Sequence, residues 1–230
     1  MKHRRFLIIH SALFLLTALV CVLSWIGSVY GWQGVNNILS GEGLRWFLHS
    51  LTDRYLNSPF LGEVTIMAFG IGLFARSGLF VLFTDIFKGV RKPSRKEKRA
   101  LTIAAFYALL YLIIIAILAL GPSEIVRSVT GSLRGSALAS GSWFLLSLGI
   151  GSLSVVYAYS VDSFNSHLDI VRGMTHGVVI FAPFFVALFF ICQFFTILLY
   201  TGIHYYIGIP EQSVNILYQL CSILSIIFTF

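Results

Sequence analysis

The sequence is short of charge. Only 11% of its 230 residues are Asp, Glu, Lys or Arg, whereas a soluble domain carries about 25%. With 57% hydrophobic residues and a mean hydropathy of +0.88, the chain has too few charges to cover a surface that faces water. The composition therefore excludes an ordinary soluble domain. It predicts a polytopic membrane protein that is surrounded by membrane lipid.

Several motifs that carry chemistry are also missing. The three cysteines, Cys21, Cys192 and Cys221, show neither a CxxC nor a Cys/His ligand spacing, so they predict no metal site. The sequence has no Walker A loop, GxSxG or HExxH motif, and no carboxylate pair at catalytic spacing on one helix. We therefore expect no enzyme and no cofactor.

The net charge of +7 comes from clusters beside apolar segments. Seven of the 16 Lys and Arg residues lie between Lys88 and Arg99, and three more lie in Met1–Arg5. Such clusters orient membrane helices rather than bind nucleic acid. We therefore expect no nucleic-acid partner.

Six apolar segments predict an all-α bundle of transmembrane helices in one membrane domain, residues 1–230. The first is too long for the apolar core of a signal peptide, so we expect it to remain as a helix. With the N-terminus inside, the inner segments hold 11 Lys and Arg and the outer ones four, which places both termini in the cytoplasm. The predicted spans are 6–29, 60–87, 101–120, 141–159, 178–200 and 214–230.

The segment between the first two spans predicts a helix of its own, over residues 43–55. Its apolar residues recur at i, i+3, i+4, i+7 and i+11, which is one face of a helix, and Trp46 suits the headgroup level. We expect an amphipathic helix on the outer membrane surface, with a lid packed against the bundle as the alternative. The face consists of Leu44, Phe47, Leu48, Leu51 and Tyr55.

The second span is unusual because charges interrupt it. Pro59–Phe87 has 29 residues, roughly 43 Å as one helix, so Glu63 and Asp85 fall near the interfaces and Arg76 is left at depth. An ionisable group at membrane depth costs about 2.5 kcal/mol or more and marks a candidate functional site. The competing interpretation is that Arg76 snorkels to the inner side. Ser77–Gly78 permits an unwound turn beside it.

Several short motifs lie between Val35 and Leu79: Leu39-Ser40, Glu42-Gly43-Leu44-Arg45-Trp46, Gly70, Gly72 and Ser77-Gly78-Leu79. Together they resemble the N-terminal part of the AbgT family, the p-aminobenzoyl-glutamate transporters and related antimetabolite exporters. Arg76 stands where this family usually has Lys. A weaker block, Asp169–Thr175 followed by Cys192-Gln193-Phe194, resembles a later family stretch.

The chain also departs from that family. Members are longer and are built from inverted repeats with re-entrant hairpins. The signature of the first hairpin is absent between the two blocks, and Leu199-Tyr200-Thr201-Gly202 replaces a later Asn…Trp…Asn pattern. The resemblance therefore implies an internally shortened member.

What the resemblance implies is a homodimeric secondary transporter in the cell inner membrane. It would move p-aminobenzoyl-glutamate or a related organic anion, coupled to a cation such as Na+ or H+. The alternative is a non-transporting scaffold, or a partner membrane subunit, that keeps only the frame helices of the family. The candidate substrate-binding or gating residues are Arg76, Ser77, Gly78, Glu63, Asp85 and Gln193.

Overall fold

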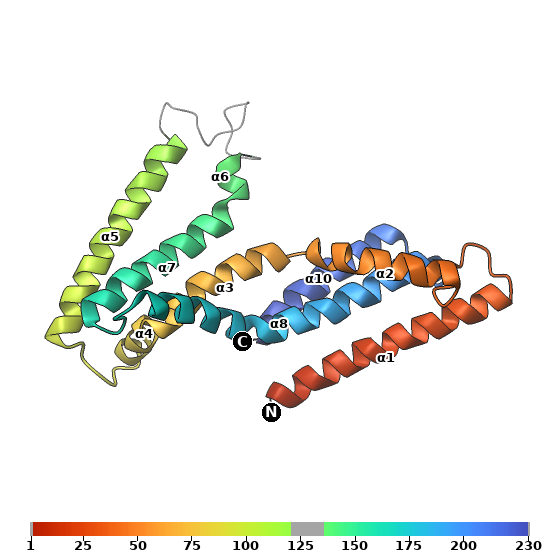
Figure 1. Ribbon diagram of the computed structural model, residues 1–230, viewed down its shortest axis with the longest axis horizontal. Coiled ribbons are helices and arrows are strands. Elements are labelled where there is room, and N and C mark those ends of the chain that lie inside the picture. Colours follow the sequence, from red (N-terminus) through yellow and green to blue (C-terminus); the bar gives the residue numbers. More distant parts are fainter. Residues whose placement is uncertain (1, 121–135, 230) are drawn as a thin grey trace. The chain divides into compact units, whose positions relative to one another are not determined.

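The computed structural model describes residues 2–120 and 136–229, and these residues form helices and no strand. The predicted all-α class is therefore confirmed (Figure 1). The predicted outer loop that begins at residue 121 lies largely outside the described residues. The helices are α1 (Lys2–Val29), α2 (Gly41–Leu56), α3 (Leu61–Arg76), α4 (Leu79–Phe87), α5 (Arg95–Leu120), α6 (Ala137–Ser140), α7 (Ser142–Val161), α8 (His167–Thr201), α9 (Ile203–Tyr206) and α10 (Glu211–Thr229).

The helices form two compact units. The terminal unit consists of Met1–Leu61 and Ala182–Phe230, and the central unit is Gly62–Phe181. Helix α8 supplies its first part to the central unit and its second part to the terminal unit. That both units belong to one membrane domain stays a prediction.

In the part of the chain that the structure describes, four helices are long and apolar enough to cross a membrane. They are Ser11–Val29 of α1, Arg95–Ala119 of α5, the whole of α7 and the whole of α8. Helices α2 and α3 add a fifth if the two form one broken span. These helices fit the predicted multi-pass membrane protein. The predicted span 214–230 is helical as α10, over Glu211–Thr229, and it is not among these helices.

The prediction of one continuous span over 60–87 is wrong, because the helix breaks at Ser77 and Gly78. Gly78 has a left-handed backbone with φ of 86°, which residues with a β-carbon avoid. The Ser77 hydroxyl accepts a hydrogen bond from the amide of Leu79 at 3.2 Å, so it satisfies a free donor at the start of α4. The length argument that placed Arg76 deep in one long helix therefore no longer applies.

Helix α8 begins eleven residues before the predicted span 178–200, at His167. Its start is a capping box: the Asp169 carboxylate accepts from the amides of Asn165 and Ser166 at 3.1 Å, and the Ser166 hydroxyl accepts from Leu168. The loop between α7 and α8 is therefore shorter than the predicted inner loop 160–177, because α7 ends at Val161 and α8 begins at His167. Helix α5 starts in the same way, with the amide of Ser94 donating to Glu97 at 2.7 Å.

Small residues hold the helices of the central unit together. A β-carbon on Gly70 of α3 would lie 2.7 Å from the Ser147 hydroxyl of α7, and one on Gly72 would lie 2.4 Å from the Gly173 carbonyl oxygen of α8. Such close approach lets backbones touch, as in many membrane helix pairs. Helices α5 and α7 run beside each other (Figure 1), and the Tyr111 hydroxyl donates to the Leu145 carbonyl at 2.7 Å.

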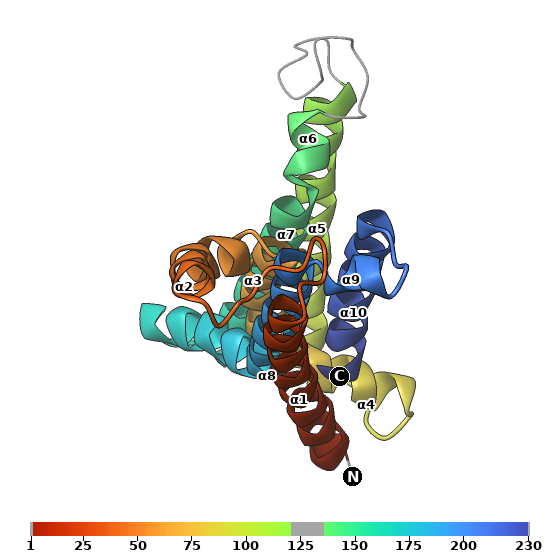
Figure 2. The same cartoon turned by 90° about the vertical axis from the view of Figure 1, so that its right-hand side faces the viewer.

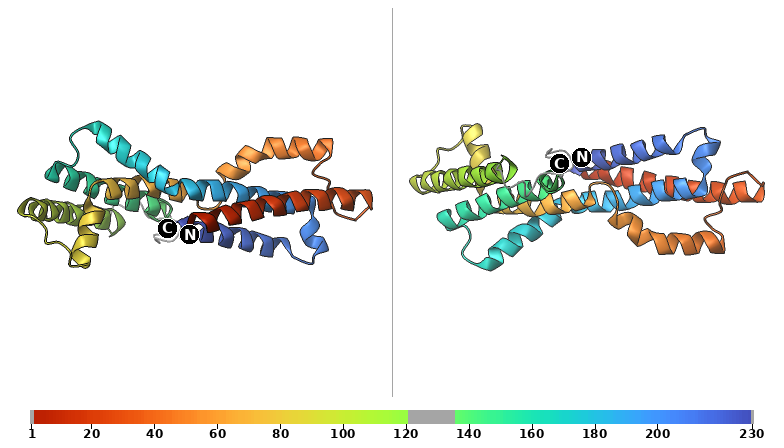
Figure 3. Two further views of the ribbon diagram at one scale, coloured as in Figure 1. Left: turned by 90° about the horizontal axis from the view of Figure 1, so that it is seen from below. Right: turned by 90° about the horizontal axis from the view of Figure 1, so that it is seen from above.

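The terminal unit packs α1, α10 and the second part of α8 side by side (Figures 2 and 3). Val214 of α10 and Ile191 and Phe195 of α8 form a core cluster that Leu13 of α1 contacts. The loop after α1 covers the end of α8, because the backbone amide of Asn36 donates to the Thr201 carbonyl at 3.0 Å. Carbonyls left free at a helix end need such partners.

The predicted amphipathic helix is confirmed as α2, capped by the Ser40 hydroxyl. Leu44 and Leu48 of its apolar face are exposed. Trp46, predicted at the headgroup level, stacks on Tyr200 of α8 with ring centroids 3.9 Å apart. The Tyr55 hydroxyl donates to the Phe185 carbonyl at 3.2 Å. These contacts agree with the lid alternative, and a place on the membrane surface stays a prediction.

Candidate functional site

Three of the predicted site residues meet at the break between α3 and α4. Ser77 is buried, and its hydroxyl donates to the Phe74 carbonyl at 2.8 Å. The Ser77 carbonyl accepts from the Ser163 hydroxyl at 3.0 Å. Gly78 supplies the left-handed turn, and the Arg76 side chain beside them is exposed. The polar groups of this break are therefore used to build the turn.

Glu63 and Arg76 lie at opposite ends of α3. Glu63 is exposed in the first turn and Arg76 is exposed in the last. An acid at the N-terminus and a base at the C-terminus of a helix are both stabilised by the helix dipole. Asp85, half-buried on α4, is on a separate helix from both. The structure thus brings Arg76, Ser77 and Gly78 together and leaves Glu63 apart.

Gln193 belongs to the terminal unit, in the second part of α8. Its side chain is buried, and its amide oxygen has no hydrogen-bond partner among the described residues. A buried polar atom without a partner costs about 1–3 kcal/mol, so such atoms mark places where another group binds or structure is strained. Gln193 lies one helical turn before Thr196, which lines a cavity.

That cavity, of about 340 Å³, is the polar cavity of the terminal unit. It lies among α2, α8 and α10 and combines one guanidinium, one carboxylate, two side-chain amides, one hydroxyl and one phenol with apolar walls. Its volume falls at the small end of ligand pockets, which span about 300–1,000 Å³. The lining residues are Asp53, Arg54, Asn57, Phe195, Thr196, Leu199, Asn215 and Tyr218.

Helix geometry explains how these side chains converge. Asp53 and Asn57 are four residues apart on α2, and Asn215 and Tyr218 are three apart on α10, so each pair shares one helix face. The Asn57 amide is oriented by donation to the Asp53 carbonyl at 2.8 Å. Arg54 lies over the Trp46 ring at 5.8 Å, a cation–π contact.

Tyr218 gives the polar cavity its buried donor. Its hydroxyl is buried without a hydrogen bond of normal geometry, although it interacts with the side chains of Cys192 and Ser58. Its ring lies 5.3 Å from that of Phe195. Buried phenols normally have a partner. The cavity thus offers a guanidinium and a carboxylate, which bind groups of opposite charge, beside a phenol and two amides that can orient a small polar ligand.

Arg54, Asn215 and Tyr218 were not among the predicted site residues. A signal was present, because Asn215 and Tyr218 are polar or amphipathic residues at i, i+3 spacing within the last apolar segment. Arg54 lies outside the apolar face of the predicted amphipathic helix. Only the packing of α2 against α8 turns this side chain toward the cavity.

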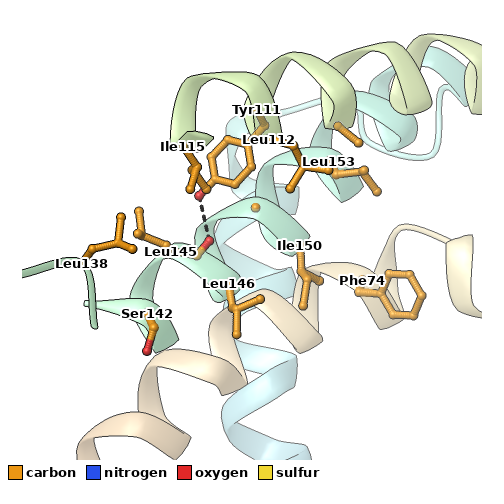
Figure 4. Close-up of a pocket in the computed structure, with 12 residues that line it drawn as sticks. Phe74, Tyr111, Leu112, Ile115, Leu138, Ser142, Leu145, Leu146, Ile150 and Leu153 are labelled. Carbon is orange, nitrogen blue, oxygen red and sulfur yellow. Dashed lines mark hydrogen bonds between the residues drawn. The ribbon is translucent and has the colours of Figure 1, made fainter. Parts of the chain in front are cut away.

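A second cavity, of about 470 Å³, lies in the central unit and is apolar. It lies between α5 and α7, with Leu138 of α6 and Phe74 of α3 at its sides (Figure 4). The Tyr111 hydroxyl donates its hydrogen bond to the Leu145 carbonyl, as the dashed line in Figure 4 shows, so this donor is already used within the protein. Such a lining suits a lipid chain or an apolar side chain of another helix, and no anion.

Within residues 2–120 and 136–229 no cluster of three His, Cys, Asp or Glu side chains has the arrangement of a metal site. No protein-family profile matches the chain, and no curated protein or solved structure matches it.

Proposed function

We propose that the chain is an internally shortened transporter of the AbgT type that moves p-aminobenzoyl-glutamate or a related organic anion or antimetabolite. One observation carries the proposal. The polar cavity of the terminal unit places the Arg54 guanidinium, the Asn57 and Asn215 amides and the buried Tyr218 hydroxyl around one space, beside the Asp53 carboxylate. Arg54 binds the carboxylate, and the aromatic ring of the anion packs on Phe195.

A transporter of this kind works in the inner membrane with both termini in the cytoplasm, and we propose six crossings. The crossing helices are α1, α3, α5, α7, α8 and α10. The coupling cation, Na+ or H+, and the homodimeric state are carried over from the resemblance. The 16 residues of α3 extend roughly 24 Å, most of the about 30 Å hydrocarbon core. A C-terminal fluorescent-protein fusion should fluoresce; a dark, membrane-inserted fusion would contradict the cytoplasmic terminus.

Flux in vesicles tests the transport proposal. Purified protein in liposomes should take up labelled p-aminobenzoyl-glutamate under a Na+ or proton gradient. Arg54→Gln should lower that flux roughly tenfold or more, because a charge-assisted hydrogen bond contributes about 1.5–3 kcal/mol. The matched control is Arg45→Gln, an exposed cation on the same helix outside the cavity, which should leave flux unchanged.

Arg76→Gln belongs in the same series, because Arg76 is the second candidate for charge recognition or gating, with Ser77 and Gly78 beside it. Flux that depends on Arg76 and not on Arg54 would move the anion site to the break between α3 and α4. Absence of flux under every gradient would contradict transport altogether.

The second candidate function is a non-transporting scaffold or partner subunit. It is favoured by the backbone roles of the residues that carry the family resemblance. Ser40 caps α2, Gly43 lies against loop carbonyls, Gly70 and Gly72 allow helix contact, and Gly78 makes a turn. A chain that gives no flux but copurifies with another membrane protein at fixed stoichiometry supports this function, and light scattering in detergent separates it from a homodimer.

A further inference from the structure

Helix α4 of the central unit is too short to cross a membrane. Its nine residues extend roughly 13 Å. Leu79 and Leu82 bury one side of it against Ala100 and Ala104 of α5 and Tyr157 of α7. The helix runs across the direction of α5 and α7 (Figures 2 and 3). If α5 and α7 cross the bilayer, α4 therefore lies along its plane.

Two contacts place α4 at one end of the central unit. The Ser163 hydroxyl, just after α7, donates to the Ser77 carbonyl at the start of α4 at 3.0 Å. Lys96 in the first turn of α5 pairs with Asp162 at the end of α7. The end of α3, the start of α5 and the end of α7 therefore meet at the same face, and α4 lies at that face.

The side of α4 that does not pack on α5 and α7 is apolar and exposed. Phe80 is 54% exposed and Phe87 is 87% exposed, and Val81 and Phe83 lie between them. An exposed apolar patch of this kind marks a contact with a membrane or a partner. Aromatic rings are the side chains that membrane interfaces favour.

A strongly basic segment follows α4 directly. Residues 88–99 contain seven Lys and Arg and one acid, Glu97. Arg91 pairs with Glu97 and Lys96 pairs with Asp162. The other five cations are exposed and make no ion pair with any described residue: Lys88, Lys92, Arg95, Lys98 and Arg99.

We propose that α4 and residues 88–99 form a docking surface for the headgroups of anionic phospholipids in one leaflet. The exposed phenylalanines of α4 insert at the level of the upper acyl chains, and the five unpaired cations bind lipid phosphates. Basic clusters beside a transmembrane helix attract anionic lipids through the negative surface potential. Neither a free phosphate nor a nucleic acid accounts for the phenylalanines beside the charges.

Lipid retention measured by native mass spectrometry tests the charges. The detergent-solubilised protein should retain phosphatidylglycerol in preference to phosphatidylcholine. Lys88→Gln/Lys92→Gln should weaken that preference about fivefold for each cation removed. The control is Arg45→Gln/Arg172→Gln, which removes two exposed cations elsewhere and should retain the preference. Equal retention of both lipids by the unmodified chain would overturn the proposal.

Two competitors distinguish other occupants in the same measurement. Glycerol 3-phosphate and a short DNA duplex should not displace phosphatidylglycerol. Displacement by glycerol 3-phosphate would reveal a site for free phosphate, and displacement by DNA would reveal a nucleic-acid surface. Either outcome overturns the lipid proposal.

A spin label tests the depth of α4 without altering its charges. Phe87→Cys is labelled in a chain whose three native cysteines are replaced by alanine and reconstituted in phosphatidylglycerol vesicles. The label should collide more often with oxygen, which dissolves in lipid, than with a water-soluble nickel chelate. A label at Gln33→Cys, an exposed position in the loop after α1, is the aqueous reference. Equal nickel accessibility at both positions would overturn the insertion of α4.

Discussion

Gly177 of α8 and Ala68 of α3 lie against each other so closely that a β-carbon on Gly177 would be 1.8 Å from the Ala68 carbonyl oxygen. Both residues are buried. The neighbour is backbone rather than a flexible side chain, so neither helix can give way locally. This contact fixes the separation of α3 and α8 in the central unit.

Gly177→Ala should therefore destabilise the central unit by about 3 kcal/mol, the upper end of the range for overpacking, or prevent folding. Thermal unfolding in detergent measures the loss. The matched control is Gly62→Ala on α3, where nothing lies within 4 Å of the added carbon. A Gly177→Ala chain as stable as the control would show that the helices are not in contact there.

Ser147 joins α7 to α3 by a single hydroxyl. It donates to the Ile66 carbonyl at 2.5 Å and accepts from the Gly70 amide at 3.1 Å. Ser147→Ala should cost about 1 kcal/mol in unfolding free energy, as buried membrane hydrogen bonds do. Ser152→Ala, which loses bonds only to its own helix, should be nearly neutral. Unfolding with an increasing fraction of denaturing detergent compares the stability of the two variants. Equal losses of unfolding free energy would contradict a role of Ser147 in joining the helices.

Gly78 tests the break between α3 and α4. Its φ of 86° is unfavourable for a residue with a β-carbon, yet no atom lies within 4 Å of the added carbon. Gly78→Ala should therefore cost about 1–2 kcal/mol through the backbone alone. Gly78→Asn should cost less, because asparagine tolerates the left-handed region. Equal stability of the alanine variant would indicate one continuous helix over residues 60–87.

The ion pair between Lys96 and Asp162 should contribute little. The two side chains are 54% and 69% exposed, and exposed pairs contribute about 0–1 kcal/mol that salt screens. Asp162→Asn removes the charge and keeps a residue that accepts the left-handed φ of 61° at this position. Its unfolding temperature should match the unmodified chain at high salt. A large loss that persists at high salt would indicate a buried contact.

Helix identity was predictable where the signal is local. The apolar segments and the spacing of Leu44, Phe47 and Leu51 predicted α1, α2 and α7 within a few residues, whereas α5 begins six residues before its predicted span. The start of α8 was missed, although Ser166-x-x-Asp169 is a capping signal that the sequence contains. An assignment from hydropathy alone takes the polar first turns of a long helix for a loop. The predicted span therefore began at residue 178 instead of His167.

The candidate site was less predictable. Ser77 and Gly78 were correctly singled out as a place where a helix can unwind, because glycine permits a positive φ. Arg76 was assigned a depth from length alone, and the break removes that argument. The polar cavity is lined by both Arg54 of α2 and Tyr218 of α10. The residue spacing within either helix does not predict that these two side chains lie around the same cavity.

The sequence by itself determined that this chain is helical, apolar and poor in charge, and that its cations gather beside apolar segments. These properties belong to short stretches, since burial in lipid requires each stretch to satisfy its own backbone. Only the tertiary structure decided where Gly177 meets Ala68, how α2 turns Arg54 toward α10, and that α4 crosses the ends of α5 and α7. Contacts between distant segments depend on shape complementarity, which composition and periodicity do not encode.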